Sequence, residues 1–133
     1  MGAYVNGKAF MNGLTLDSLT LPNGWLGSSA GTVQGPISGA TATVVNTDVM
    51  IIVASSAYGV ACTVSLPSLA SSPNQQVIIK DVGGNASTHN ITIDPDGAET
   101  IDGALSSLAI STNMGAVTLI NGVGTWFNSS DNS

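Results

Sequence analysis

The stretch VACTVSLP, residues 60–67, contains the pattern from which the fold can be predicted. Apolar residues at positions 60, 62, 64 and 66 alternate with small or polar residues at positions 61, 63 and 65. A period of two is typical of a β-strand with one face buried and the other in contact with water. Pro67 ends the strand because proline has no backbone N–H to donate to a sheet.

Similar short runs extend in both directions from this stretch, and turn-forming sequences separate them. Expected strands are Thr41–Val45, Val49–Ser55, Val77–Ile79, Ile91–Ile93, Thr100–Gly103, Leu108–Ser111, Val117–Ile120 and Thr125–Asn128. Turns are expected at GGN (83–85), DPDG (94–97) and NGVG (121–124), the last of which links two strands as a hairpin. This spacing predicts an all-β fold, a small antiparallel sandwich or barrel-like domain. No helix longer than about two turns and no repeat of solenoid period is predicted.

The first 40 residues differ from the rest because glycine is frequent and the period of two is absent. We therefore divide the chain into an N-terminal docking arm, residues 1–40, and a β-rich knob domain, residues 41–133. Leu19, Leu21, Trp25 and Leu26 are the apolar side chains of the arm that we expect to bind a partner. The alternative is that this segment packs on its own domain as an edge strand with loops.

The composition limits the partners that this protein can have. Only 8% of the residues are charged, against about 25% in a typical soluble protein, while 43% are hydrophobic. The net charge is −6, and Lys8 and Lys80 are the only cations. Binding to nucleic acid or to an anionic membrane surface needs clustered Lys and Arg, so neither partner is expected. Residues 1–17 contain no continuous apolar segment, and we expect no signal peptide and synthesis in the cytoplasm.

An uncharged, β-rich surface is suited to contact between subunits, since charged residues are depleted at interface cores. The runs Val49–Ala54 and Val77–Ile79 would favour aggregation if they were exposed. We therefore expect them to be buried, within a trimer or within a well-closed monomer.

Candidate chemical sites are few. Asp94, Asp96, Glu99 and Asp102 form the one acidic cluster. Asp94 and Asp96 could contribute to a calcium site, but the spacing does not match an EF-hand loop, and turn formation explains them better. A glycosidase pair among these acids is disfavoured, because six aromatic residues in 133 leave little with which to build a carbohydrate groove.

The remaining reactive side chains are assigned structural positions. The single histidine, His89, is expected in an exposed loop, and the single cysteine, Cys62, is expected as a buried free thiol. Trp126 follows a predicted hairpin and is expected in the core. No catalytic residue, cofactor or metal is therefore predicted, and the chain is not expected to be an enzyme.

The order of several short motifs resembles a module of virion surface proteins of tailed bacteriophages. The motifs are LP (66–67), NQQVIIKD (74–81), GGNA (83–86), NITI (90–93), GAETIDG (97–103), NMGAVTL (113–119) and Trp126. The resemblance covers about residues 44–128 and does not include the first 40 residues. Such modules occur in tail fibres and head fibres, and they are commonly small β domains that assemble as trimers. The family has no agreed catalytic residues, so none is transferred.

The resemblance implies a homotrimeric structural protein on the virion exterior. The first hypothesis is a capsid decoration or head-fibre protein whose arm docks on the major capsid protein or on another virion protein. The second is a tail-associated fibre or tip protein that contacts the host surface, with a surface glycan as its partner. A small hydrolase or sugar-binding protein unrelated to viruses is the third.

Overall fold

A computed structural model of the chain describes residues 31–130. The fold consists of two β-sheets with short connections, and the alternating sequence pattern accounts for most of its strands. The elements are β1 (Thr32–Ile37), β2 (Thr41–Thr43), β3 (Asp48–Val53), η4 (Ser55–Tyr58), β4 (Cys62–Ser65), η5 (Leu69–Ser71), β5 (Gln76–Asp81), β6 (Ile91–Asp94), β7 (Leu108–Ile110), β8 (Ala116–Asn121) and β9 (Trp126–Asn128). Within residues 31–130 the only helices are the short 3-10 turns η4 and η5.

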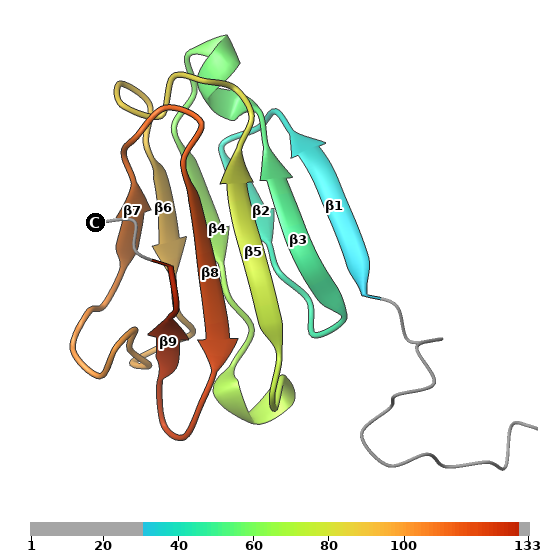
Figure 1. Ribbon diagram of the computed structural model, residues 1–133, viewed down its shortest axis with the longest axis vertical. Helices are drawn as coiled ribbons and strands as arrows, with labels where there is room; N and C mark the ends of the chain where they lie inside the picture. The colour runs from blue at the N-terminus through green and yellow to red at the C-terminus, as the bar shows by residue number, and fades with distance from the viewer. Residues whose placement is uncertain (1–30, 131–133) are drawn as a thin grey trace, which may run out of the picture. The chain divides into compact units, whose positions relative to one another are not determined.

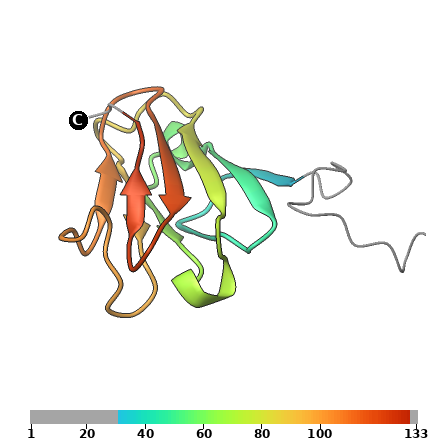
Figure 2. The ribbon, with the colours of Figure 1, turned by 60° about the horizontal axis from the view of Figure 1, so that its bottom comes forward.

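The nine strands divide between a five-stranded sheet, called sheet A, and a four-stranded sheet, called sheet B. Sheet A has the order β1-β3-β5-β8-β9, and sheet B has the order β2-β4-β6-β7. Figure 1 shows sheet A in front of sheet B, and Figure 2 shows the same two layers after a turn about the horizontal axis. The prediction of an all-β domain is confirmed at this level.

The predicted antiparallel pairing is wrong for much of the fold. In the described part of the chain, four strand pairs are parallel and three are antiparallel. From β1 to β6 the chain crosses to the other sheet after every strand, so strands that become neighbours run in the same direction. Neither sheet closes on itself, so the fold is not a barrel. The parallel strands of sheet B begin at residues 41, 62 and 91, and this unequal spacing explains why no fixed repeat is visible in the sequence.

Strand β1 falls inside the segment assigned to the docking arm. Thr32–Ile37 pairs with β3 at the edge of sheet A, as the alternative prediction of an edge strand allowed. Pro36 suits such a position, since a proline on an edge strand withholds one donor from further pairing. The segment from Thr100 to Gly103 contributes isolated bridges at Ile101 rather than a full strand.

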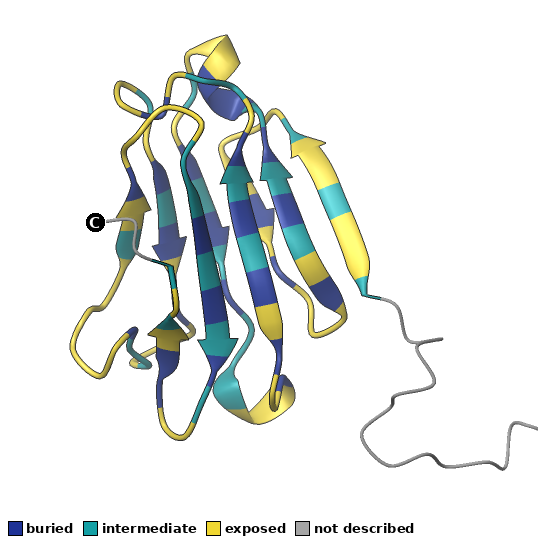
Figure 3. Ribbon diagram, viewed as in Figure 1, coloured by how far each residue is buried: buried dark blue, intermediate teal, exposed yellow. Residues whose placement is uncertain are grey.

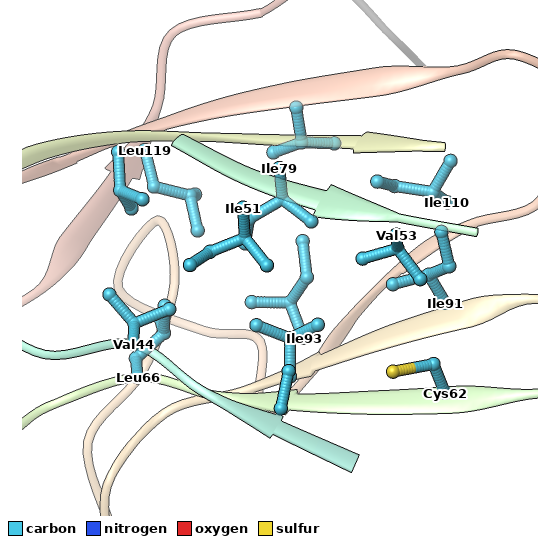
Figure 4. Close-up of a cluster of buried hydrophobic side chains, with 14 of the residues drawn as sticks. Val44, Ile51, Val53, Cys62, Leu66, Ile79, Ile91, Ile93, Ile110 and Leu119 are labelled. Atoms are coloured by element: carbon cyan, nitrogen blue, oxygen red, sulfur yellow. The ribbon is translucent and has the colours of Figure 1, made fainter. Parts of the chain in front are cut away.

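The hydrophobic core lies between the two sheets. Figure 4 shows Ile51, Val53, Ile79 and Leu119 from sheet A facing Cys62, Ile91 and Ile93 from sheet B. These seven side chains are almost fully buried, and Val64 of sheet B is fully buried too. Trp126 is also completely buried and Cys62 is a buried free thiol, which confirms both predictions.

Candidate assembly surface

The four side chains predicted to bind a partner, Trp25, Leu26, Leu19 and Leu21, lie outside the described residues. The candidate surface that the structure does describe is the outer side of sheet A, the side turned toward the viewer in Figure 1. We call it outer face A and define it by six apolar side chains: Val33, Met50, Ile52, Ile78, Ile120 and Phe127.

Strand geometry places these side chains on the side opposite the core. In β5 and β8, and from residue 50 onward in β3, the buried residues alternate with exposed or partly exposed ones, and the alternating bands are visible in Figure 3. Ile79 is fully buried, so its neighbour Ile78 points away from the core. Val33 and Phe127 are 55% and 45% exposed. The outward side of sheet A is therefore rich in apolar side chains, with the polar Gln76, Lys80 and Thr118 among them.

The register of the strands joins these residues into continuous rows across the sheet. Met50 is opposite Ile78, which is opposite Thr118 on the next strand. Ile120 is opposite Phe127 on β9, and Val33 on β1 is opposite Met50. Directly opposed side chains on one face of a sheet are in contact, so the apolar residues form two rows, one from Val33 through Met50 to Ile78 and one from Ile120 to Phe127. Polar residues interrupt the surface: Thr118, Lys80 and Gln76 lie opposite Ile78, Ile52 and Ile120.

Charge is nearly absent from outer face A. Its one charged side chain is Lys80, whose ammonium group donates a hydrogen bond to the carbonyl of Met114 at the end of the sheet that carries η4. Of the acidic residues that the structure describes, Asp48 and Asp81 are buried, and the exposed ones, Asp94, Asp96 and Asp102, belong to the end of β6 and the connection from β6 to β7.

The outer side of sheet B has a different character. Its parallel register aligns Thr41, Thr63 and Thr92 in one row, and Thr43 and Ser65 lie in the next. These small hydroxyl side chains are solvated readily, so this face satisfies the usual pattern of one core side and one polar side. The contrast identifies outer face A as the unusual surface of the described domain.

Asp81 joins three connections at the end of sheet A that carries η4. Its carboxylate accepts hydrogen bonds from the Ser56 hydroxyl at 2.8 Å and from the backbone N–H groups of Gly83 and Met114 at 2.9 and 3.0 Å. Gly84 N–H also donates to it, and Gly84 has a φ of 78°, which glycine adopts without strain. We call these five residues the Asp81 clamp.

The clamp has electrostatic as well as geometric consequences. Burial raises the pKa of the Asp81 carboxyl, but the hydrogen bonds from Ser56, Met114, Gly83 and Gly84 lower it by more, and the net pKa lies below its ordinary value. Asp81 is thus an ionised group that fixes loops. Its donors occupy both carboxylate oxygens.

A hollow of about 340 Å³ lies at the opposite end, between η5 and the β8–β9 hairpin. Its lining residues are Leu69, Ala70, Pro73, Asn74, Asn121, Gly122, Val123 and Gly124, none of which is charged. Asn121 holds the two sides together, because its amide Nδ2 donates to the carbonyls of Leu69 and Ser72 at 2.9 and 2.6 Å. Val123, at the hairpin tip, is 97% exposed.

The four acidic residues grouped in the sequence do not converge on one site, because Glu99 and Asp102 are engaged in separate hydrogen bonds. Both oxygens of Glu99 accept from the backbone N–H of Leu69, at 3.0 and 3.1 Å, and Asp102 accepts from the backbone N–H of Asn128 at 2.9 Å. Asp94 and Asp96 are exposed at the end of β6 and in the following turn. Across residues 31–130, no group of three His, Cys, Asp or Glu side chains could hold a metal ion. His89 does lie in a loop, but it is half-buried rather than exposed.

Outer face A was not identified residue by residue from the sequence, although a signal for it was present. The strand sequences DVMIIV and QVIIKD contain apolar runs that do not alternate with polar residues. Such runs are typical of strands that are covered on both sides. The expectation that Val49–Ala54 and Val77–Ile79 would be buried is met on the core side alone within the described chain.

Comparison of the sequence with models of known protein families and with curated proteins found no match. Over the described range, the chain contains no helix with the length and hydropathy needed to span a bilayer.

Proposed function

We propose that this chain is a structural protein of the exterior of a tailed-bacteriophage particle, a capsid decoration or head-fibre subunit that works as a homotrimer. The observation that supports this proposal best is outer face A, a wide apolar sheet surface on a domain that also has very few charges. A surface of this kind is typical of proteins whose working state is an assembly.

The positions of the phage-like motifs in the fold add support. Lys80-Asp81, Gly83-Gly84 and Asn113-Met114-Gly115 come from three separate motifs, and the Asp81 clamp brings them together. The three motifs therefore occur together for a physical reason, because together they fix the connections at one end of sheet A.

The proposal assigns different roles to the two parts of the chain. The β domain forms the trimeric knob. The N-terminal segment, with Leu19, Leu21, Trp25 and Leu26, docks on the major capsid protein or on another virion protein, since buried aromatic side chains contribute much of the energy of interfaces.

A second candidate, a tail-associated tip protein that contacts the host surface, is favoured by the hollow beside η5. Its lining offers the amide group of the exposed Asn74 next to apolar surface from Leu69 and Val123, and it carries no charge. This combination suits a neutral glycan better than a charged ligand.

Gold-labelled antibody against the protein, applied to intact virions and viewed by electron microscopy, tests the location. We expect label over the head. Label confined to the tail would replace the first candidate with the second, and virions without label would contradict both. Particles that lack the protein serve as the control for antibody specificity.

A further inference from the structure

We propose that Asn121 is a site of spontaneous deamidation, that opening of the β8–β9 hairpin controls the reaction, and that the product prevents the hairpin from closing again. The inference goes beyond the proposed function and does not depend on it. It concerns the start of the sequence NGVG, residues 121–124, which connects β8 to β9.

The first argument is the residue that follows Asn121. Within residues 31–130, Asn121-Gly122 is the one place where glycine follows asparagine. Deamidation begins when the backbone nitrogen of the following residue attacks the side-chain carbon Cγ of asparagine, and glycine has no side chain to hinder this approach. The fold also favours glycine at this position: a Cβ on residue 122 would lie 2.1 Å from Cε2 of Phe127, so any other residue would displace that ring.

The reaction needs no partner other than water. The nitrogen of Gly122 forms a bond to Cγ of Asn121, the bond from Cγ to Nδ2 breaks, and ammonia leaves with the proton of the Gly122 nitrogen. Water then opens the resulting succinimide ring at one of its two carbonyls. The product at position 121 is aspartate or, where the chain continues through the side chain, isoaspartate.

The second argument is that the folded hairpin engages both reacting groups. The N–H of Gly122 donates to the carbonyl of Thr125 at 3.0 Å. Asn121 is 7% exposed, and its Nδ2 donates to the carbonyls of Leu69 and Ser72 at 2.9 and 2.6 Å and to the Ser72 hydroxyl at 3.0 Å. These bonds must break before the nitrogen can turn toward Cγ, so the reaction proceeds through an opened hairpin.

The third argument is the effect of the product on the contacts of Asn121. The Nδ2 group that leaves as ammonia is the donor to the carbonyls of Leu69 and Ser72. A carboxylate in its place has only acceptor oxygens, so these carbonyls lose their donor and meet a negative charge. Isoaspartate also adds a methylene group to the backbone at the end of β8, where Asn121 is paired with Trp126. The modified hairpin therefore cannot restore its contacts with η5, and a charge enters a hollow whose lining has none.

The rate of the reaction is measured on the full chain by peptide mapping with mass spectrometry, in mildly alkaline buffer with and without guanidinium chloride. Peptide mapping separates position 121 from the Asn-Gly pairs at residues 6–7, 12–13 and 23–24. We expect the unfolded chain to be modified at position 121 and the folded chain to react much more slowly. The factor between the two rates should match the hydrogen-exchange protection factor of the Gly122 N–H, because one opening controls both.

Two variants of the hairpin test whether its opening controls the rate. Phe127→Ala removes the ring that lies against Gly122, and it should speed modification of the folded chain by about threefold. Val123→Ala is the matched control in the same hairpin, because the side chain of Val123 is 97% exposed, and it should leave the rate unchanged. Circular dichroism checks that each variant is folded.

The effect of the product is tested with Asn121→Asp, which places the carboxylate at this position alone. Amide hydrogen exchange in residues 69–75 should be at least about fivefold faster than in the wild type. Asn128→Asp is the control, because it adds the same charge on β9 and keeps the oxygens that accept from Ser130. Exchange in residues 69–75 should be unchanged in this control.

The inference is overturned by an unfolded chain that is not modified at position 121, or by equal rates in the folded and unfolded chains. It is also overturned by a folded Phe127→Ala that reacts no faster than Val123→Ala, or by a folded Asn121→Asp with the exchange rates of the wild type. The rate measurements use Asn121 itself, so they decide the first two steps even where Asn121→Asp does not fold.

Discussion

The hydroxyl of Ser56 and the carboxylate of Asp81 are joined by a buried hydrogen bond of 2.8 Å between η4 and the end of β5. The same Ser56 oxygen accepts from the backbone N–H of Asn85 at 3.2 Å, so one side chain connects two loops. The approach is close enough that a Cβ on Gly83 would collide with Ser56 and Ala57. This explains why a glycine follows β5 at that position.

Replacement of Asp81 by Asn should destabilise the fold strongly. An amide in this position keeps one oxygen to accept but turns its NH2 group toward the donors of the other position, either Gly83 or Met114, and a buried donor left without a partner costs about 1–3 kcal/mol. We expect the free energy of unfolding, measured with urea at fixed protein concentration, to fall by about 2–4 kcal/mol. Asp94→Asn, at an exposed carboxylate, is the control and should change it by less than about 0.5 kcal/mol. Equal effects of the two substitutions would contradict the role of the clamp.

Ionisation of the Asp81 carboxylate should also contribute to the pH dependence of the free energy of unfolding. Burial raises the pKa of Asp81 and its hydrogen bonds lower it by more, so the folded pKa lies below the unfolded value of about 3.9. A depressed folded pKa gives stability that is fully present above the unfolded pKa and is lost as the pH falls through the folded one. The wild type should therefore lose more stability than Asp81→Asn between about pH 5 and pH 2. Parallel curves for the two proteins would show that Asp81 is not the group responsible.

Much of the fold is predictable from the period of two, and the limits of that pattern are physical. Alternation shows which side chains of Cys62–Ser65 face inward, but it does not show which strand lies beside them. Parallel and antiparallel pairing therefore could not be distinguished. Strand β1 was expected only in the alternative interpretation, as an edge strand without bounds, because Gly35 and Pro36 interrupt its pattern.

The sequence predicted that the fold has a covered apolar surface, but it did not predict which residues form that surface. The apolar runs in β3 and β5 indicated that something covers them, but the sequence does not say which half of each run faces sheet B. The Asp81 clamp was not predictable at all, since residues 56, 81 and 114 are far apart in the sequence, and the pairing of β3, β5 and β8 within sheet A brings them together.

Asn121 should stabilise the connection between η5 and the β8–β9 hairpin. Its side chain is 7% exposed, and its Nδ2 donates to Leu69 and Ser72. Asn121→Ala should lower the free energy of unfolding by about 1–3 kcal/mol and speed amide hydrogen exchange in residues 69–75. Asn46→Ala is the control, because its exposed amide makes one bond of 3.3 Å to Ser71 in the same segment, and it should have a much smaller effect. Unchanged exchange in Asn121→Ala would show that the hairpin is held by other contacts.

The two sides of sheet B should respond differently to truncation. Ile93 is fully buried between the sheets, and Ile93→Ala should lower the free energy of unfolding by about 2–5 kcal/mol because it leaves a cavity. Its neighbour Thr92 points outward, and Thr92→Ala should cost less than about 1 kcal/mol. Both variants are measured by urea denaturation at one protein concentration. A larger loss of stability for Thr92→Ala than for Ile93→Ala would mean that Thr92, and not Ile93, points into the core.

The thiol of Cys62 should be chemically inert in the folded protein. Burial raises the pKa of this thiol, and the thiolate is the reactive form. A disulfide reagent at about pH 8.5, where an exposed cysteine is half ionised, should label no thiol in the native protein and one per chain in guanidinium chloride. Ser129→Cys adds an exposed thiol as a positive control. Rapid labelling of the native wild type would contradict the burial of this side chain.

Trp25 should anchor the protein to its particle if the docking proposal is right. A buried tryptophan at an interface commonly contributes roughly 2 kcal/mol or more, so Trp25→Ala should weaken binding to particles that lack the protein by about 10-fold or more. Trp25→Phe keeps an aromatic ring and should retain more of the affinity. Binding is measured by co-sedimentation over a range of protein concentrations, and circular dichroism checks the fold of each variant. Unchanged binding by a folded Trp25→Ala would place the contact elsewhere in the chain.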